Sequence, residues 1–73
     1  MRIKLRPIGL IKRFVEEQDR EVPDSFTPRR LIQDLAIPAE LKMMAFVNGT
    51  RRDLDANLAD GDEIKLVTIL TGG

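Results

Sequence analysis

Two short segments near the ends of the chain alternate between polar and apolar residues, and this alternation limits the possible folds more than any other feature. One segment is Arg2-Ile3-Lys4-Leu5-Arg6, and the other is Glu63-Ile64-Lys65-Leu66-Val67-Thr68-Ile69. Because successive side chains of a strand point to opposite faces, a period of two predicts strands with one buried face. We expect Pro7 to close the first strand, and the segment from Glu63 to be the longest strand.

The region between these strands predicts two helical segments. After Gly9, apolar residues recur at helical spacing, which indicates a short amphipathic helix whose apolar side belongs to the core: Leu10, Ile11, Phe14 and Val15. Thr27-Pro28 predicts a helix start, because Thr accepts a hydrogen bond from an orphan backbone N–H and Pro loses no useful donor there. This helix should run to about Leu35 and end because of Pro38. Its expected buried stripe is Leu31, Ile32 and Leu35.

Three further strands complete the expected domain. Met43 to Val47 reads as a strand, and Asn48-Gly49 suits a tight hairpin turn because both residues tolerate positive φ. A short strand should return from Thr50 to Asp53, and Asp19 to Pro23 is a candidate brief strand. The order of elements predicts an α+β fold, a mixed sheet of four to five strands with one main helix packed on one face. We expect a single domain over residues 1–73.

The composition excludes several classes of function. No Cys and no His occurs among the 73 residues, which removes the usual transition-metal ligands, thiol nucleophiles and the commonest general base. Twelve Lys and Arg balance twelve Asp and Glu, so we expect neither nucleic acid nor a membrane as a partner. No long apolar stretch is present, and we expect a cytoplasmic protein.

Four motifs in the C-terminal third resemble one family. They are Phe46-Val47-Asn48-Gly49, Leu58, Asp60-Gly61-Asp62-Glu63-Ile64 and the terminal Thr71-Gly72-Gly73. With them the chain resembles the ubiquitin-like β-grasp sulfur carriers, most closely the small subunit of molybdopterin synthase and next the thiamine-type carriers. Prolines that commonly precede the terminal glycines of the molybdopterin type are replaced here by Thr68-Ile69-Leu70, so the pathway stays open.

The resemblance implies a non-catalytic carrier that needs no cofactor. Gly73 would be adenylated by a separate ATP-dependent activating enzyme and converted to a thiocarboxylate, which donates sulfur in molybdenum or tungsten cofactor biosynthesis. The expected second partner is the larger catalytic subunit of a synthase. Thr71 and Gly72 would thread the flexible tail into an active site, and the three residues after Leu70 can span about 10 Å. The absence of Cβ atoms on the glycines suits a narrow channel.

The face of the last strand that the helix leaves uncovered is a candidate docking surface. Lys65, Val67 and Ile69 share this face by alternation. Phe46 would add to an apolar patch if it projects beside Val67, and a place for Phe46 in the core is equally compatible with the sequence. We therefore predict partner docking at Val67, Ile69, Lys65 and Phe46, and we assign Met43 and Met44 to packing.

Other interpretations remain beside these. Asp60, Asp62 and Glu63 fit a turn better than a cation site. The pairs Arg29-Arg30 and Arg51-Arg52 fit solvated surface better than a phosphate site. A sulfur carrier for thiamine, cysteine or tRNA thiolation, a ubiquitin-like protein modifier and a plain interaction domain are alternative functions, and the terminal glycines are also compatible with a frayed end.

Overall fold

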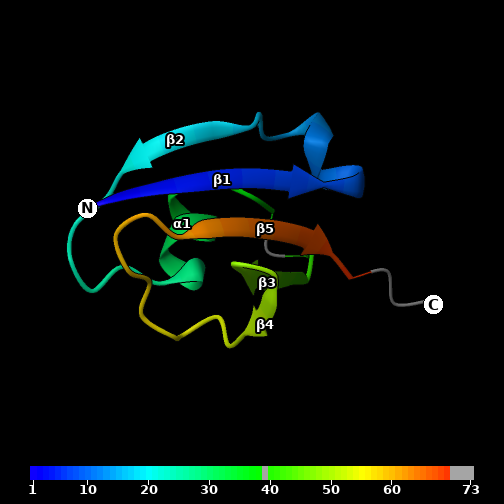
Figure 1. Cartoon of the computed structure of the whole chain (residues 1–73). Helices are drawn as coiled ribbons and strands as arrows, with labels where there is room; N and C mark the ends of the chain where they lie inside the picture. Colours follow the sequence, from blue (N-terminus) through cyan, green and yellow to red (C-terminus); the bar gives the residue numbers. More distant parts are fainter. Residues whose placement is uncertain (39, 70–73) are drawn as a thin grey trace.

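A computed structural model, which describes residues 1–38 and 40–69, contains a five-stranded mixed sheet with one α-helix on one face (Figure 1). The elements are β1 (Arg2–Ile8), the 3-10 helix η1 (Gly9–Arg13), β2 (Gln18–Glu21), α1 (Pro28–Asp34), β3 (Met43–Val47), β4 (Thr50–Arg52) and β5 (Glu63–Thr68). The strand order is β2-β1-β5-β3-β4. β1 and β5 are parallel, and the other pairs are antiparallel. The predicted α+β architecture is confirmed.

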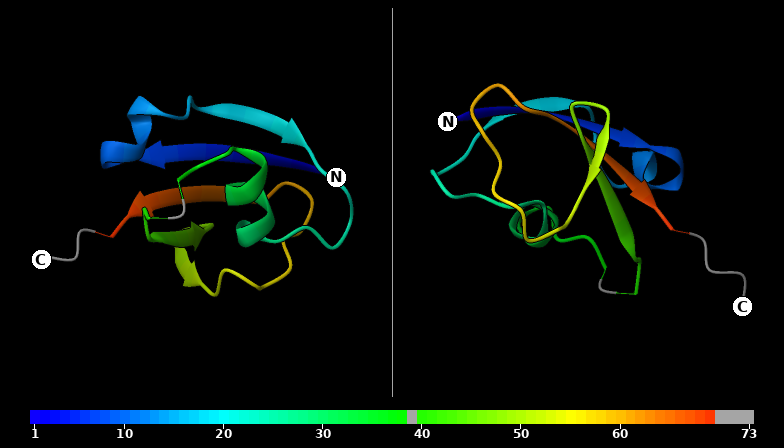
Figure 2. Two further views of the ribbon diagram at one scale, coloured as in Figure 1. Left: turned by 180° about the vertical axis from the view of Figure 1, so that it is seen from behind. Right: turned by 60° about the horizontal axis from the view of Figure 1, so that its bottom comes forward.

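The core lies between α1 and the sheet face that α1 covers (Figure 2). Leu31 of α1 is fully buried, as are Leu5 of β1 and both Ile64 and Leu66 of β5. Phe26, which precedes α1, is buried as well. Alternation along β5 thus buries Ile64 and Leu66 and leaves Lys65 and Val67 on the other face of the sheet.

Pro7 does not end β1, contrary to the sequence prediction, because the strand continues to Ile8. The N–H of Lys4 donates to the Asp62 carbonyl on the β5 side, so the backbone nitrogens of odd-numbered residues face β2. Pairing with β2 stops at Leu5, while pairing with β5 continues through Pro7 and Ile8. The missing N–H of Pro7 therefore falls where no β2 partner exists, which is the position in a sheet that tolerates proline.

The segment after β1 is shorter and more exposed than predicted. Ile11 and Val15 are buried, but Leu10 and Phe14 are exposed, so their assignment to the core is wrong. The Val15 N–H donates to the Ile11 carbonyl at 3.0 Å, so one turn joins these two residues, and both belong to the core. A single 3-10 turn offers one buried side, which leaves the other apolar pair in solvent.

The start of α1 follows its sequence signature. Thr27 is the N-cap, and its hydroxyl accepts a hydrogen bond of 3.2 Å from the Arg30 N–H. Pro28 occupies the first helical position. The helix ends at Asp34 with Leu35 as its C-cap, close to the predicted end at Leu35, and Ala36 then adopts the left-handed φ of 56°. Ile32 and Leu35 are only partly buried against the core, in contrast to Leu31.

The β3–β4 hairpin also has the predicted turn. Asn48 and Gly49 have φ values of 52° and 85°, as a two-residue hairpin loop requires. β4 is brief and ends at Arg52 rather than Asp53. Among the described residues, no helix has the length and apolar character needed to cross a membrane.

Candidate functional site

β5 carries the chain toward its C-terminus and is held on both sides. It pairs with β1 along five positions, Lys4 to Ile8, and with β3 along five positions, Met43 to Val47. After β5 ends, the Ile69 N–H still donates to the Lys42 carbonyl at 2.8 Å. The strand at the centre of the sheet therefore anchors the chain up to Ile69, the last residue that the structure describes.

The turn before β5 fixes the register of that strand through carboxylate hydrogen bonds. Asp62 accepts from the Ala59 N–H at 2.7 Å and from the Asn48 side-chain amide at 2.9 Å. The Asn48 amide oxygen accepts from the Glu63 N–H at 3.0 Å, and Asp60 accepts from the Arg2 N–H at 2.7 Å. A slip of one residue would turn every β5 side chain to the opposite face, so this network decides which β5 side chains face α1.

The sheet face opposite α1, here called the open face, carries an apolar row across three strands. Val67 of β5 pairs with Ile8 of β1 on one side and with Met44 of β3 on the other. Val67 and Met44 are half-buried, and Ile8 is exposed. Because directly paired residues lie on the same face, these three side chains form one row.

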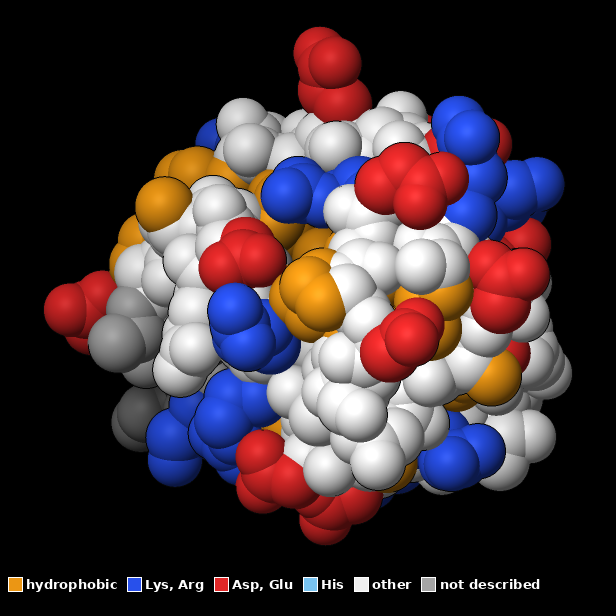
Figure 3. Space-filling view, turned by 90° about the vertical axis from the view of Figure 1, so that its left-hand side faces the viewer, with side chains coloured by type: hydrophobic (Ala, Val, Ile, Leu, Met, Phe, Trp, Pro, Cys, Tyr) orange, Lys and Arg blue, Asp and Glu red, His pale blue; other side chains and the backbone are white. Residues whose placement is uncertain are grey.

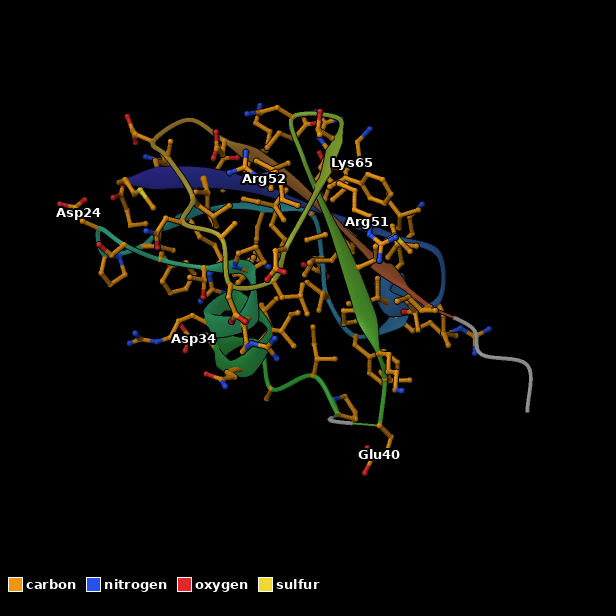
Figure 4. All side chains as sticks on the ribbon, turned by 90° about the horizontal axis from the view of Figure 1, so that it is seen from below. Asp24, Asp34, Glu40, Arg51, Arg52 and Lys65 are labelled. Atoms are coloured by element: carbon orange, nitrogen blue, oxygen red, sulfur yellow. The ribbon has the colours of Figure 1, made fainter. Side chains whose placement is uncertain are left out.

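The adjacent row of the open face combines Phe46 with cations. Lys65 pairs with Phe46 on one side and with Arg6 on the other, and Arg51 of β4 pairs with Phe46. Figure 4 shows Lys65 and Arg51 on the side of the sheet away from α1. The Arg6 Nε lies 3.2 Å from Glu63 Oε2, within ion-pair range but without hydrogen-bond geometry. Lys65 and Arg51 form no ion pair with any described residue.

The structure brings Phe46, Lys65 and Val67 onto one face, so a core position for Phe46 does not occur. Ile69 follows the end of β5, is half-buried and lines a hollow beside α1 with Ile37 and Leu41, so the structure does not group it with Lys65 and Val67 on the open face. The predicted acceptor Gly73 and the tail residues Thr71 and Gly72 lie outside the described residues. Their roles, and the docking role of the open face, stay predictions.

Two apolar members of the open face, Met44 and Ile8, are not among the docking residues that the sequence predicts. Met44 was assigned to packing, but it is half-buried on the open face, whereas Met43 is buried in the core. Ile8 is absent from the predicted surface, because the sequence predicts that the first strand ends at Pro7. Neighbouring residues of a strand point to opposite faces, so Met43 and Met44 cannot both lie in the core. The sequence therefore carries a signal that one of them is on the open face.

The arginine pairs occupy separate surroundings on the protein surface. Arg29 forms a two-pronged ion pair with Asp55, with Nε–Oδ1 at 2.7 Å, and Arg30 lies over the Phe26 ring at 5.8 Å. The hydrogen bond from Arg29 lowers the pKa of Asp55 and raises that of Arg29. The Arg29 N–H also donates to the Leu54 carbonyl, so this pair fastens the segment after β4 to α1.

The acidic residues of the turn act as backbone acceptors. Within residues 1–38 and 40–69, no group of three or more Asp and Glu is arranged to hold a metal ion. Asp60 and Asp62 use their oxygens on backbone and amide donors, as the turn interpretation predicts.

Comparisons with known proteins agree on the fold. The model of the ThiS family matches residues 8–73. Subunit 1 and 2 of the molybdopterin-converting factor of Helicobacter pylori form a solved complex, in which one chain is 27% identical with a TM-score of 0.69, and 100% of both chains is covered. Small archaeal modifier protein 1 of Haloferax volcanii is 16% identical with a TM-score of 0.77, again with 100% of both chains covered.

A ubiquitin of Caldiarchaeum subterraneum is 22% identical with a TM-score of 0.65, covering 100% of this chain and 98% of that one. None of the curated proteins matches the chain. The two likenesses below 25% identity concern the fold, which is the ubiquitin-like β-grasp predicted from the sequence.

Proposed function

The chain belongs to the ThiS family, and from this premise we propose that it is a sulfur carrier whose working group is the carboxylate of Gly73. The match covers the whole C-terminal part of the chain, including Thr71-Gly72-Gly73. This family match over residues 8–73 is the observation that carries the proposal. The central position of β5 supports it, because a firmly held strand leads directly to the tail.

The chemistry begins with activation of Gly73. A carboxylate is a poor electrophile, so a separate enzyme transfers AMP from ATP to the Gly73 carboxylate and releases pyrophosphate. Attack by sulfide then displaces AMP and leaves a thiocarboxylate; a persulfide donor first gives an acyl disulfide, which a thiol reduces to the same product. The chain has neither Cys nor His, so the catalytic groups belong to the partner enzymes. The use of ATP favours a cytoplasmic setting.

We place the stored sulfur in molybdopterin biosynthesis, the pathway of the molybdenum and tungsten cofactors. The sequence motifs around Asn48-Gly49 and Asp60-Gly61-Asp62 support this, as does the likeness to the Helicobacter pylori complex of subunits 1 and 2. By that likeness the larger catalytic subunit of a synthase is the second partner. Carriers for thiamine, cysteine or tRNA thiolation share the same terminus and remain the alternatives within this class.

The open face is the proposed docking surface for these partners. Val67 and Phe46 supply its apolar centre, Lys65 supplies a cation without an ion pair among the described residues, and Ile69 lies where the tail begins. Such a mixed patch suits a partner surface with apolar and acidic groups. The chain itself catalyses nothing in this scheme.

A second candidate function is protein modification, which uses the same adenylation but ends in an isopeptide bond to lysines. The likeness to small archaeal modifier protein 1 favours it as the alternative. Covalent adducts of this chain in cells would support it, whereas a thiocarboxylate without adducts supports the carrier.

Intact mass spectrometry tests the main proposal. The chain is incubated with ATP, its cognate activating enzyme and a sulfur source. We expect a mass increase that corresponds to exchange of one oxygen for sulfur, and none for a chain that lacks Gly73. Absence of the exchange, with an enzyme that is active on another carrier, would contradict the proposal. Full function in cells without Gly73 would point to a plain interaction domain.

A further inference from the structure

Exposed apolar side chains gather between the end of β1 and the end of η1. Among the described residues, the exposed large hydrophobic side chains are Ile8, Leu10 and Phe14, with 38%, 42% and 58% of their surface exposed. Phe14 contrasts with Phe26, which is buried, and with Phe46, which is half-buried. We call Leu10 and Phe14 the η1 ridge. An exposed apolar group of this kind marks a surface for a partner.

The η1 ridge lies at the end of the molecule where β5 finishes. η1 packs against β5 and β1, and Figures 1 and 2 agree in placing η1 and the C-terminal end of β5 at the same end of the sheet. Ile8 pairs with Val67, so it connects the ridge to the open face. The opposite end presents interspersed acidic, basic and apolar side chains (Figure 3).

The length of the tail limits where an enzyme that acts on Gly73 can sit. Four residues follow Ile69, and four residues span at most about 14 Å when extended. An active site that receives Gly73 must therefore come within this distance of Ile69. Its surrounding surface then lies against the end of the molecule that carries the η1 ridge.

The charges beside the ridge indicate the chemistry of this partner. Lys12 and Arg13, in the last turn of η1, are exposed and form no ion pair with any described residue. Of the two acidic residues that follow, Glu17 lies 3.9 Å from Arg6 and Glu16 is exposed. A partner surface that complements the ridge has an apolar recess that receives Leu10 and Phe14, and Asp or Glu carboxylates that face Lys12 and Arg13.

We propose that the η1 ridge docks the ATP-dependent enzyme that activates Gly73, through such an apolar recess edged with Asp and Glu. This inference rests on the proposed function and adds a recognition element outside the open face. Adenylation is the first step at Gly73, so the activating enzyme is the first partner that must reach the end of β5.

Activation kinetics test the ridge. With the cognate activating enzyme and ATP, pyrophosphate release is measured as the concentration of the carrier chain is varied. Leu10→Ala and Phe14→Ala should each raise KM about tenfold. The kcat should not change, because the ridge contributes binding rather than contacts to the reacting carboxylate. Lys12→Glu with Arg13→Glu should raise KM and weaken its dependence on salt.

Controls separate recognition from folding. Arg30→Glu reverses an exposed charge on α1, outside the ridge, and should leave KM unchanged. Phe14→Leu keeps an apolar side chain and should restore most of the affinity that Phe14→Ala loses. Urea unfolding of each variant shows whether the fold persists. If Phe14→Ala is unfolded, the KM values of Phe14→Leu and of the double variant at Lys12 and Arg13 decide whether the ridge binds the enzyme.

The outcomes distinguish this inference from the proposed function. If the wild-type chain is activated at Gly73 and the ridge variants keep a KM within about twofold of it, the docking role of the ridge is wrong and the carrier function stands. If an active enzyme does not activate the wild-type chain, the carrier function and the ridge proposal both fail.

Discussion

Removal of the Asp62 carboxylate should destabilise the whole domain, because two hydrogen bonds before β5 depend on it. Asp62 accepts from the Ala59 N–H at 2.7 Å and from the Asn48 amide at 2.9 Å. Each such bond contributes about 1 kcal/mol net, so Asp62→Ala should lower the free energy of unfolding by about 2 kcal/mol. That is about half of the stability of about 3–5 kcal/mol expected for a domain of this size.

Urea unfolding followed by circular dichroism measures this loss, and the midpoint temperature should fall by about 10 °C. Asp60→Ala removes one bond, to the Arg2 N–H, and should cost about 1 kcal/mol. Asp24→Ala is the control, because the exposed Asp24 side chain has no hydrogen bond or ion pair to any described residue, and it should stay within about 0.5 kcal/mol. If Asp62→Ala costs no more than Asp24→Ala, the network does not hold the turn.

Four further changes test other parts of the structure. Hydrogen bonding to Arg29 lowers the pKa of Asp55 below 3.8, so the ion pair stabilises the fold above that pH. The difference in unfolding free energy between wild type and Asp55→Ala should therefore disappear as pH falls through the lowered pKa, and urea titrations at neutral and acid pH measure this difference. Gly49→Ala should cost about 1–2 kcal/mol in the same assay from backbone strain alone, since φ is 85° and no atom lies within 4 Å of the added Cβ. Leu31→Ala, in a fully buried position, should cost about 2–5 kcal/mol and leave much of the chain unfolded by circular dichroism. Val67→Asp should weaken partner binding, measured by calorimetry with the synthase subunit at a temperature where circular dichroism shows that the variant is folded.

Three of these measurements each have a result that would contradict the reasoning for that change. A stability gap for Asp55→Ala that is equal at both pH values would exclude the ion pair as its cause. Unchanged stability of Gly49→Ala would show that the turn can adopt another geometry. Partner binding that survives Val67→Asp would move the docking surface away from the open face.

Local sequence determined the order of the elements, the N-cap of α1 and the hairpin turn. The N-cap at Thr27 and the Asn48-Gly49 turn depend on backbone chemistry within a few residues, so their signatures are visible in the sequence. The motifs around them also identified the family before any geometry was known. The alternation in β5 fixed which side chains share a face, because the period of a strand is a local property.

The tertiary structure decided which face is covered and where each strand stops. Pro7 stays within β1 because pairing with β2 ends at Leu5, a fact that depends on the length of a distant strand. Leu10 and Phe14 look like core residues by spacing, and only the single turn of η1 against β5 leaves them in solvent. Periodicity establishes that an element has two sides, but burial requires a neighbour, and neighbours are set by pairing between segments far apart in the sequence.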